Sequence, residues 1–287
     1  MGLTLLGAGA VISAGPSYTG VLDLYPGAGV AYSVRRLSGS YFGGAFRVRR
    51  SSDNVEQDIG FLANGNLNEA QLTSFIGVND GFIAGWYDQS GNGNNANQTN
   101  AINQPKIVSS GVVNKLNLKP VITFDGINDF IPIDSAPFVT NPTLFFVFKP
   151  LGNSPGFTRN GGVITMHGSS IIVNNHFGVT DPDWYDSFCS STRPYITSGL
   201  TSQQYLGTMH HTGTSIVASL NGNPDITVAA SIDTSLTRYG IGNFLTGYYN
   251  TFPSNNQYQE VILYPDDQSS NKSAIKANMN TYYTIYP

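Results

Sequence analysis

Short runs of hydrophobic and β-branched residues, separated by turn residues, recur along most of the chain. The runs are about four to eight residues long, and several alternate hydrophobic with polar positions, which is typical of strands. They lie at residues 30–37, 45–50, 82–87, 121–124, 144–148, 163–166, 171–173, 215–220, 226–229 and 258–263. This spacing predicts an all-β fold, a sandwich of antiparallel strands.

Two segments have helical periodicity instead. Residues 68–75 predict a short helix with Leu67, Leu72 and Phe75 on one side. Near the C-terminal end, Ser269 or Ser270 can cap a second helix that packs on the sandwich. Its expected apolar face consists of Ala274, Ile275, Asn278, Met279 and Tyr282.

The strongest hairpin signal is Asn221-Gly222, which lies between two strand-like runs. Both residue types tolerate a positive φ, as a tight turn between antiparallel strands requires. We therefore expect a hairpin there.

Composition narrows the classes of partner. Charged residues make up 11% of the chain, and the formal net charge is −4, whereas an average protein has about 25% charged residues. Without a basic surface we expect neither nucleic acid nor a membrane as a partner. A single cysteine, Cys189, excludes an internal disulfide and a thiolate zinc site.

The first residues, Met1 to Ala14, are apolar but lack the basic start of a secretion signal, and they are too short and glycine-rich to span a bilayer. We interpret residues 1–16 as an anchoring arm and residues 17–287 as one large domain. The arm is expected to attach the protein to neighbouring subunits, in a homo-oligomer.

Two segments resemble the concanavalin-like jelly rolls of laminin-G domains and legume lectins. One is Lys119-Pro-Val-Ile-Thr-Phe-Asp-Gly-Ile-Asn-Asp-Phe130, and the other is Gln259-Glu-Val-Ile-Leu-Tyr264, followed by the capped helix. The resemblance implies a jelly-roll sandwich of two antiparallel sheets.

A more specific resemblance covers roughly residues 30–130. Tyr41-Phe-Gly-Gly-Ala-Phe-Arg-Val-Arg-Arg-Ser-Ser-Asp53, Asp58-Ile-Gly60 and Trp86-Tyr-Asp-Gln-Ser-Gly-Asn-Gly-Asn-Asn95 are similar to the front half of the α-L-arabinofuranosidase B catalytic domain. Similar segments occur in many phage virion proteins.

The loop at residues 88–94 has two interpretations. As a tight turn, its side-chain oxygens bond back to free backbone amides, and its glycines permit unusual φ and ψ. As a binding site, Asp88, Asn92 and Asn94 would hold Ca²⁺ or a sugar, with Trp86 or Tyr87 as a stacking surface. Trp184 is a further candidate for stacking on a sugar. Apart from this Ca²⁺, we expect no cofactor and no metal.

Two other acidic segments also have a structural and a ligand-binding interpretation. Asp125 and Asp129 predict a turn whose carboxylates accept backbone N–H groups, and secondly a metal or glycan site. Arg49 and Asp53 are expected to share a strand face and form an ion pair; the alternative is an arginine fork that holds a ligand carboxylate.

Catalysis has weaker support in the sequence. A glycosidase needs two carboxyl groups at one cleft, and Glu260 and Asp183 are the first suspects. The arabinofuranosidase family, however, carries adjacent cysteines that form a sugar-stacking disulfide, whereas residues 75–81 here contain none. His210 and His211 are adjacent on a strand and point to opposite faces, so they predict no metal site.

The leading hypothesis is a phage virion protein, a capsid-decorating, head-fibre or tail subunit on the particle surface, with a lectin-like domain facing solvent or host glycans. The alternatives are a glycoside hydrolase of the α-L-arabinofuranosidase type and a free carbohydrate-binding module.

Overall fold

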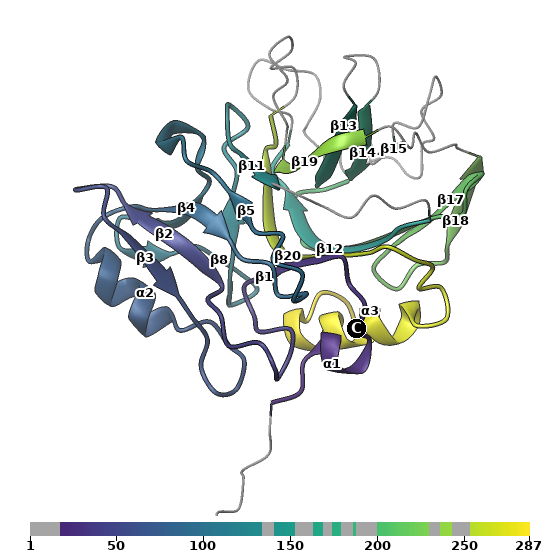
Figure 1. Cartoon of the computed structure of the whole chain (residues 1–287), viewed down its shortest axis with the longest axis horizontal. Coiled ribbons are helices and arrows are strands. Elements are labelled where there is room, and N and C mark those ends of the chain that lie inside the picture. The colour runs from purple at the N-terminus through teal and green to yellow at the C-terminus, as the bar shows by residue number, and fades with distance from the viewer. Residues whose placement is uncertain are drawn as a thin grey trace, which may run out of the picture.

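The computed structural model describes residues 18–133, 141–152, 163–168, 174–178, 186–187, 200–229, 236–242 and 253–287. Within them the chain is mostly β, and every strand pair is antiparallel (Figure 1). The main strands are β1 (Val30–Ser33), β2 (Phe46–Arg50), β3 (Glu56–Ile59), β4 (Gly81–Trp86), β6 (Lys106–Ser109), β11 (Phe130–Ile133), β12 (Thr143–Pro150), β13 (Ile164–Gly168), β14 (Asn174–Gly178), β16 (Tyr205–His211), β17 (Ser215–Leu220), β18 (Ile226–Ala229), β19 (Leu236–Gly242) and β20 (Asn256–Tyr264).

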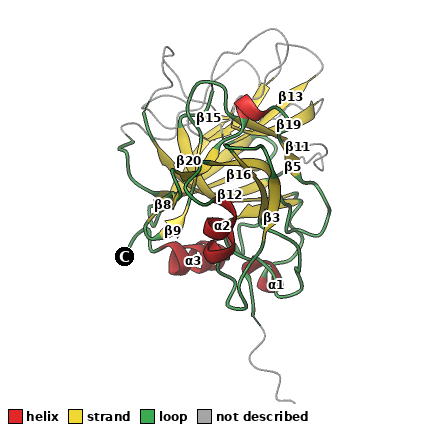
Figure 2. Ribbon diagram, turned by 90° about the vertical axis from the view of Figure 1, so that its left-hand side faces the viewer, coloured by secondary structure: helices red, strands yellow, loops and turns green. Residues whose placement is uncertain are grey.

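Short strands complete the sheet: β5 (Ala96–Asn97), β7 (Val112–Val113), β10 (Ile122–Thr123) and β15 (Asp186–Ser187). β8 (Lys115–Leu116) and β9 (Lys119–Pro120) form a separate two-stranded sheet. The helical elements are α1 (Val21–Leu24), α2 (Glu69–Ile76), the 3-10 turn η1 (Ala101–Asn103) and α3 (Lys272–Tyr283). Figure 2 shows all three α-helices on the same side of the strands.

Strand β20 lies at the centre of the strand network. It pairs with β12 along one edge and with β1 and β10 along the other. From β12 the sheet continues through β16 and β17 to β18, and from β10 through β6 and β4 to β2 and β3. β5 and β11 connect β4 to a second branch of strands, β19, β13, β14 and β15.

The core is made by strands that are buried on both faces. In β12, Leu144 to Phe148 are all fully buried, and β20 is buried over nearly its whole length. Continuous hydrophobic runs of this kind are expected where both faces of a strand are covered. Gly207 in β16 allows close packing, because a Cβ placed there would lie 2.3 Å from the ring of Phe146.

The predicted helices both form, with shifted boundaries. α2 begins after Asn68, whose side chain accepts a hydrogen bond from the Gln71 amide. α3 begins after Asn271, and neither Ser269 nor Ser270 is its N-cap. Its buried residues are Ile275, Lys276, Met279 and Tyr283, so Ala274, which is exposed, was wrongly assigned to the apolar face.

The predicted hairpin joins β17 and β18, but its connection is longer than a two-residue turn. Ala218 pairs with Ile226, and residues 221–225 form the loop. Asn221 has the expected positive φ of 53°. Its side-chain oxygen accepts a hydrogen bond from the Leu206 amide, which ties the loop to β16.

The predicted ion pair between Arg49 and Asp53 is wrong. Strand β2 ends at Arg50 and the chain turns back at once, so Asp53 reaches Arg50, with 2.6 Å between the closest atoms. Arg49 instead donates to Gln104 Oε1 at 2.6 Å. The side chains of β2 alternate between its faces as predicted, but the turn after the strand places Asp53 beside Arg50.

Candidate functional site

The Asp88 carboxylate is buried and its hydrogen bonds are all made within the protein. Its Oδ1 accepts from the Ala31 and Ser90 amides at 2.8 and 2.9 Å, and its Oδ2 accepts from the Asn94 amide at 3.0 Å and the Ser90 hydroxyl at 2.7 Å. A carboxylate offers about four acceptor positions. This arrangement therefore gives Asp88 a structural part, joining the loop after β4 to β1.

The asparagines of the same loop also bond to backbone. Asn92 Nδ2 donates to the carbonyls of Ala28 and Gly29, and Asn94 Nδ2 donates to Gly29 at 3.1 Å. Within the described ranges there is no cluster of three or more His, Cys, Asp or Glu side chains arranged to hold a metal ion. The geometry matches the turn interpretation of this loop.

The two aromatic residues before Asp88 face different surroundings. Trp86 is fully buried, with its ring 5.8 Å from that of Tyr32, so it belongs to the core and offers no surface to a sugar. The Tyr87 hydroxyl donates to Asp58 Oδ1 at 2.6 Å, and burial together with that hydrogen bond raises the pKa of Tyr87. Trp184 and Asp183 lie outside the described residues.

Glu260 is fully buried in β20 and is held by an ion pair. Arg35 Nε and Nη2 donate to its two oxygens at 2.7 and 2.9 Å. Ser33 and Tyr283 add hydroxyl donors at 2.8 and 3.0 Å. Burial, followed by the charge of Glu260, raises the pKa of Tyr283 well above its usual value. With both oxygens engaged, Glu260 joins β1, β20 and α3.

His210 and His211 make separate contacts, as the strand geometry predicts. The Gly213 amide donates to His211 Nδ1 at 2.9 Å. His210 lies near a carboxylate that is distant in sequence. Asp267 Oδ1 is 3.5 Å from its Nε2. Its Nδ1 lies 3.1 Å from the Thr143 hydroxyl, which is fully buried. Because the Thr143 hydroxyl is buried, the series Asp267, His210 and Thr143 offers no nucleophile that a substrate could reach.

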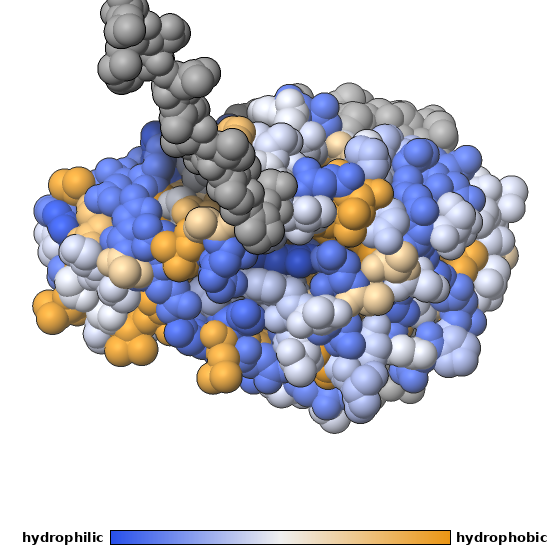
Figure 3. Space-filling view, turned by 90° about the horizontal axis from the view of Figure 1, so that it is seen from below, coloured by the Kyte–Doolittle hydropathy of each residue, from blue (hydrophilic) through white to orange (hydrophobic). Residues whose placement is uncertain are grey.

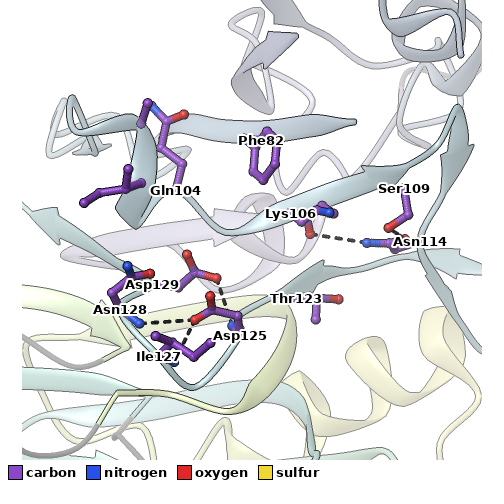
Figure 4. Close-up of a pocket in the computed structure, with 12 residues that line it drawn as sticks. Phe82, Gln104, Lys106, Ser109, Asn114, Thr123, Asp125, Ile127, Asn128 and Asp129 are labelled. Carbon is purple, nitrogen blue, oxygen red and sulfur yellow. Dashed lines mark hydrogen bonds between the residues drawn. The ribbon is translucent and has the colours of Figure 1, made fainter. Parts of the chain in front are cut away.

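A cavity of about 640 Å³ lies between β4, η1, β6 and the turn at residues 125–129 (Figure 4). Its volume falls within the range of small-molecule sites. Phe82 and Gln104 reach it from one wall and the turn forms the opposite wall. We call it the Asp125–Asp129 cavity.

Two carboxyl groups line this cavity. Asp125 is exposed, and its Oδ1 accepts from the amides of Ile127 and Asn128 at 2.7 and 3.2 Å. Asp129 is 5% exposed, and its Oδ2 accepts from the Asp125 amide at 2.8 Å. These bonds confirm the predicted turn. Burial, reinforced by the negative charge of Asp125, raises the pKa of Asp129 to about 7.

The remaining lining is mixed in character. Lys106 Nζ lies 2.8 Å from Asp80 Oδ2 and 5.2 Å from the centre of the Phe82 ring. Ile102 and Ile127 are 69% and 57% exposed. The cavity thus combines two carboxyl groups, a lysine and an apolar rim, contributed by strands that are far apart in sequence.

Comparison with known families and solved structures found similarity to glycoside hydrolases. The family model of the catalytic domain of α-L-arabinofuranosidase B matches residues 23–121, which confirms the resemblance of the front half. No curated protein is similar enough in sequence to count as a relative.

Among solved structures, a GH54 α-L-arabinofuranosidase soaked with a cyclic sulfate inhibitor shares 14% sequence identity and a TM-score of 0.62, covering 88% of this chain and 62% of that chain. A mutant of GH54 α-L-arabinofuranosidase soaked with 4-nitrophenyl α-L-arabinofuranoside has the same identity and coverage, with a TM-score of 0.63. A Trypanosoma rangeli sialidase in complex with 2,3-difluorosialic acid shares 12% identity and a TM-score of 0.50, covering 69% of this chain and 31% of that chain.

This chain therefore spans less than two thirds of the length of the arabinofuranosidase structures it matches. At such low identity, the similarity shows a shared β-sandwich fold. In the described residues no helix is long and apolar enough to cross a membrane.

Proposed function

We propose that this chain is a glycoside hydrolase of the α-L-arabinofuranosidase type, acting in the Asp125–Asp129 cavity. The match of residues 23–121 to the arabinofuranosidase B catalytic domain supports the substrate class. The likeness over 88% of the chain supports the finer fold, a concanavalin-like jelly roll of two antiparallel sheets.

The observation that carries the proposal is the pair of carboxyl groups in different environments at one cavity. Glycoside hydrolysis needs a protonated acid to deliver a proton to the leaving oxygen, and a second carboxylate beside it. Asp129, with a pKa near 7, retains its proton at mildly acidic pH, while Asp125 is exposed to solvent. Pairs whose surroundings separate their pKa values are typical acid and base partners.

The test is release of 4-nitrophenol from 4-nitrophenyl α-L-arabinofuranoside by the purified chain. We expect turnover that decreases as the pH rises through about 7, because the acid form of Asp129 disappears there. Asp129→Asn is expected to reduce kcat by at least about 100-fold. Asp53→Asn, the same chemical change at a surface ion pair, serves as the matched control. Absence of turnover in the unmodified chain would refute the proposal.

One observation favours a second candidate, glycan binding without turnover. Both carboxyl groups come from a single turn, whereas a hydrolase positions its two carboxyls on either side of the bond that is cleaved. Saturable binding of arabinofuranosyl oligosaccharides without release of product, weakened by Asp129→Asn, would support this candidate.

A place on a virion surface, attached through Met1 to Ala14, stays a prediction, because that arm lies outside the described residues. Either carbohydrate proposal is compatible with it, since a particle subunit can carry a glycan-directed domain.

A further inference from the structure

A second cavity, of about 480 Å³, lies between α3 and the loop that joins β17 to β18. Lys272, Lys276 and Asn280 line it from α3, Asp225 lines it from the loop, and Tyr286 lines it from the segment after the helix. We call it the α3 cavity. It shares no lining residue with the Asp125–Asp129 cavity.

The positive charge in the α3 cavity exceeds the negative charge. Lys272 forms an ion pair with Asp225. Lys276 is 9% exposed, and its ammonium donates to the Ser219 hydroxyl at 3.2 Å. Among the described residues no carboxylate pairs with Lys276. An ammonium has three donors. Lys276, which lines the cavity, therefore has two donors beyond its bond to Ser219.

A buried cation without a counter-ion is unfavourable, and it is stabilised by an anion that enters beside it. Burial, and then the charge of Lys272, lowers the pKa of Lys276, which is the direction expected for an ammonium that lacks a carboxylate partner. Since Asp225 already neutralises Lys272, the cavity is suited to a ligand with one negative charge.

Tyr286 adds an aromatic ring to the lining of the cavity. The ring lies close to the loop, 3.5 Å from where a Cβ on Gly222 would stand. Sugar rings stack on aromatic side chains, while polar groups nearby fix their orientation. Seen from below, the side that bears α1 and α3 is largely hydrophilic, with separate hydrophobic patches rather than one apolar surface (Figure 3). A hydrophilic ligand fits this side better than a hydrophobic partner.

We propose that the α3 cavity binds an acidic sugar, with its carboxylate at Lys276 and its ring against Tyr286. This site is separate from the one argued above and does not depend on arabinofuranosidase activity. It would let the domain recognise uronic acid units of a polysaccharide at a position distinct from the hydrolytic cavity.

The test compares four probes, glucuronate, glucose, acetate and inorganic phosphate, by NMR or calorimetric titration of the full chain. Glucuronate is expected to bind at least ten times more tightly than each of the other three, because only glucuronate has both the ring and the carboxylate. Equal binding of phosphate or acetate would overturn the assignment to a sugar. No binding of glucuronate would overturn the whole proposal.

Lys276→Met keeps an unbranched side chain, one atom shorter, and removes its charge, and it is expected to weaken glucuronate binding at least tenfold. Lys115→Met removes a lysine that pairs with Glu69 and does not line the cavity, and it is the matched control. Tyr286→Ala tests the ring wall independently and is expected to weaken glucuronate binding but not acetate binding. Unchanged affinity in both Lys276→Met and Tyr286→Ala would refute the site.

Asp129→Asn separates the two proposals. It is expected to reduce kcat for the arabinofuranoside by at least about 100-fold and to leave glucuronate binding at the α3 cavity unchanged, so either proposal can fail without the other. Loss of glucuronate binding in Asp129→Asn would assign the acidic sugar to the Asp125–Asp129 cavity and overturn the α3 assignment.

Discussion

Replacing Asp129 with asparagine should change the stability of the fold in a pH-dependent way. In the folded protein, burial and the charge of Asp125 raise the pKa of Asp129 from 3.8 to about 7. Between these two pH values the folded chain holds a proton that the unfolded chain has lost. Stability therefore decreases as pH rises from about 4 to 7, and the loss is complete above that range.

The size of the effect follows from the same pKa. Raising it from 3.8 to about 7 disfavours the ionised form in the fold by up to about 4 kcal/mol, since a tenfold change in an ionisation constant corresponds to about 1.4 kcal/mol. Asparagine does not ionise, and its oxygen can still accept from the Asp125 amide. Asp129→Asn should thus be nearly neutral at pH 4 and stabilising at pH 8.

Urea denaturation at several pH values between 4 and 8 measures this difference. Asp53→Asn is the control, because ion pairing with Arg50 lowers the pKa of Asp53, the opposite direction to the shift at Asp129. A stability difference for Asp129→Asn that is the same at every pH would refute the reasoning, and so would destabilisation at pH 8. If the variant is stable but inactive, the loss of turnover is chemical in origin.

The other predictions concern the buried residues. Arg35→Met should destabilise the fold by about 3–5 kcal/mol in chemical denaturation, because it leaves Glu260 as a buried, unpaired charge, and adding Glu260→Leu should recover part of that loss. Chelation with EDTA should leave the melting temperature unchanged, whereas Asp88→Ala should lower it, because four donors lose their acceptor. Gly207→Ala should also lower it, because the new Cβ would overlap the Phe146 ring; an unchanged melting temperature would contradict that packing.

Strand positions followed from the sequence because strands are short hydrophobic or β-branched runs bounded by turn residues. The runs at 144–148 and 258–263 predicted β12 and β20 to within a few residues. The turns at Asp88 and Asp125 were also predictable, because each aspartate accepts a hydrogen bond from a backbone amide only a few residues away. Local chemistry of this kind needs no knowledge of the tertiary structure.

The candidate site could not be predicted from the sequence, because the pairing of distant strands creates it. Phe82 and Asp129 line one cavity through the pairings of β4 with β6 and of β6 with β10, and no pattern along the chain specifies which strands pair. The same holds for Glu260, which was a suspect for catalysis until its pairing with Arg35 was visible. Burial changed the significance of Trp86 in the same way, from a possible stacking surface to a core residue.

The place of β20 determines when this domain can fold. Ser33 in β1 and Glu260 in β20 are hydrogen-bonded although they are 227 residues apart in sequence, and β12 also completes its pairing through β20. During synthesis, the hydrophobic strands made first must wait until β20 has left the ribosome. We expect slow folding, and a nascent chain that exposes apolar strand edges and depends on chaperones to avoid aggregation.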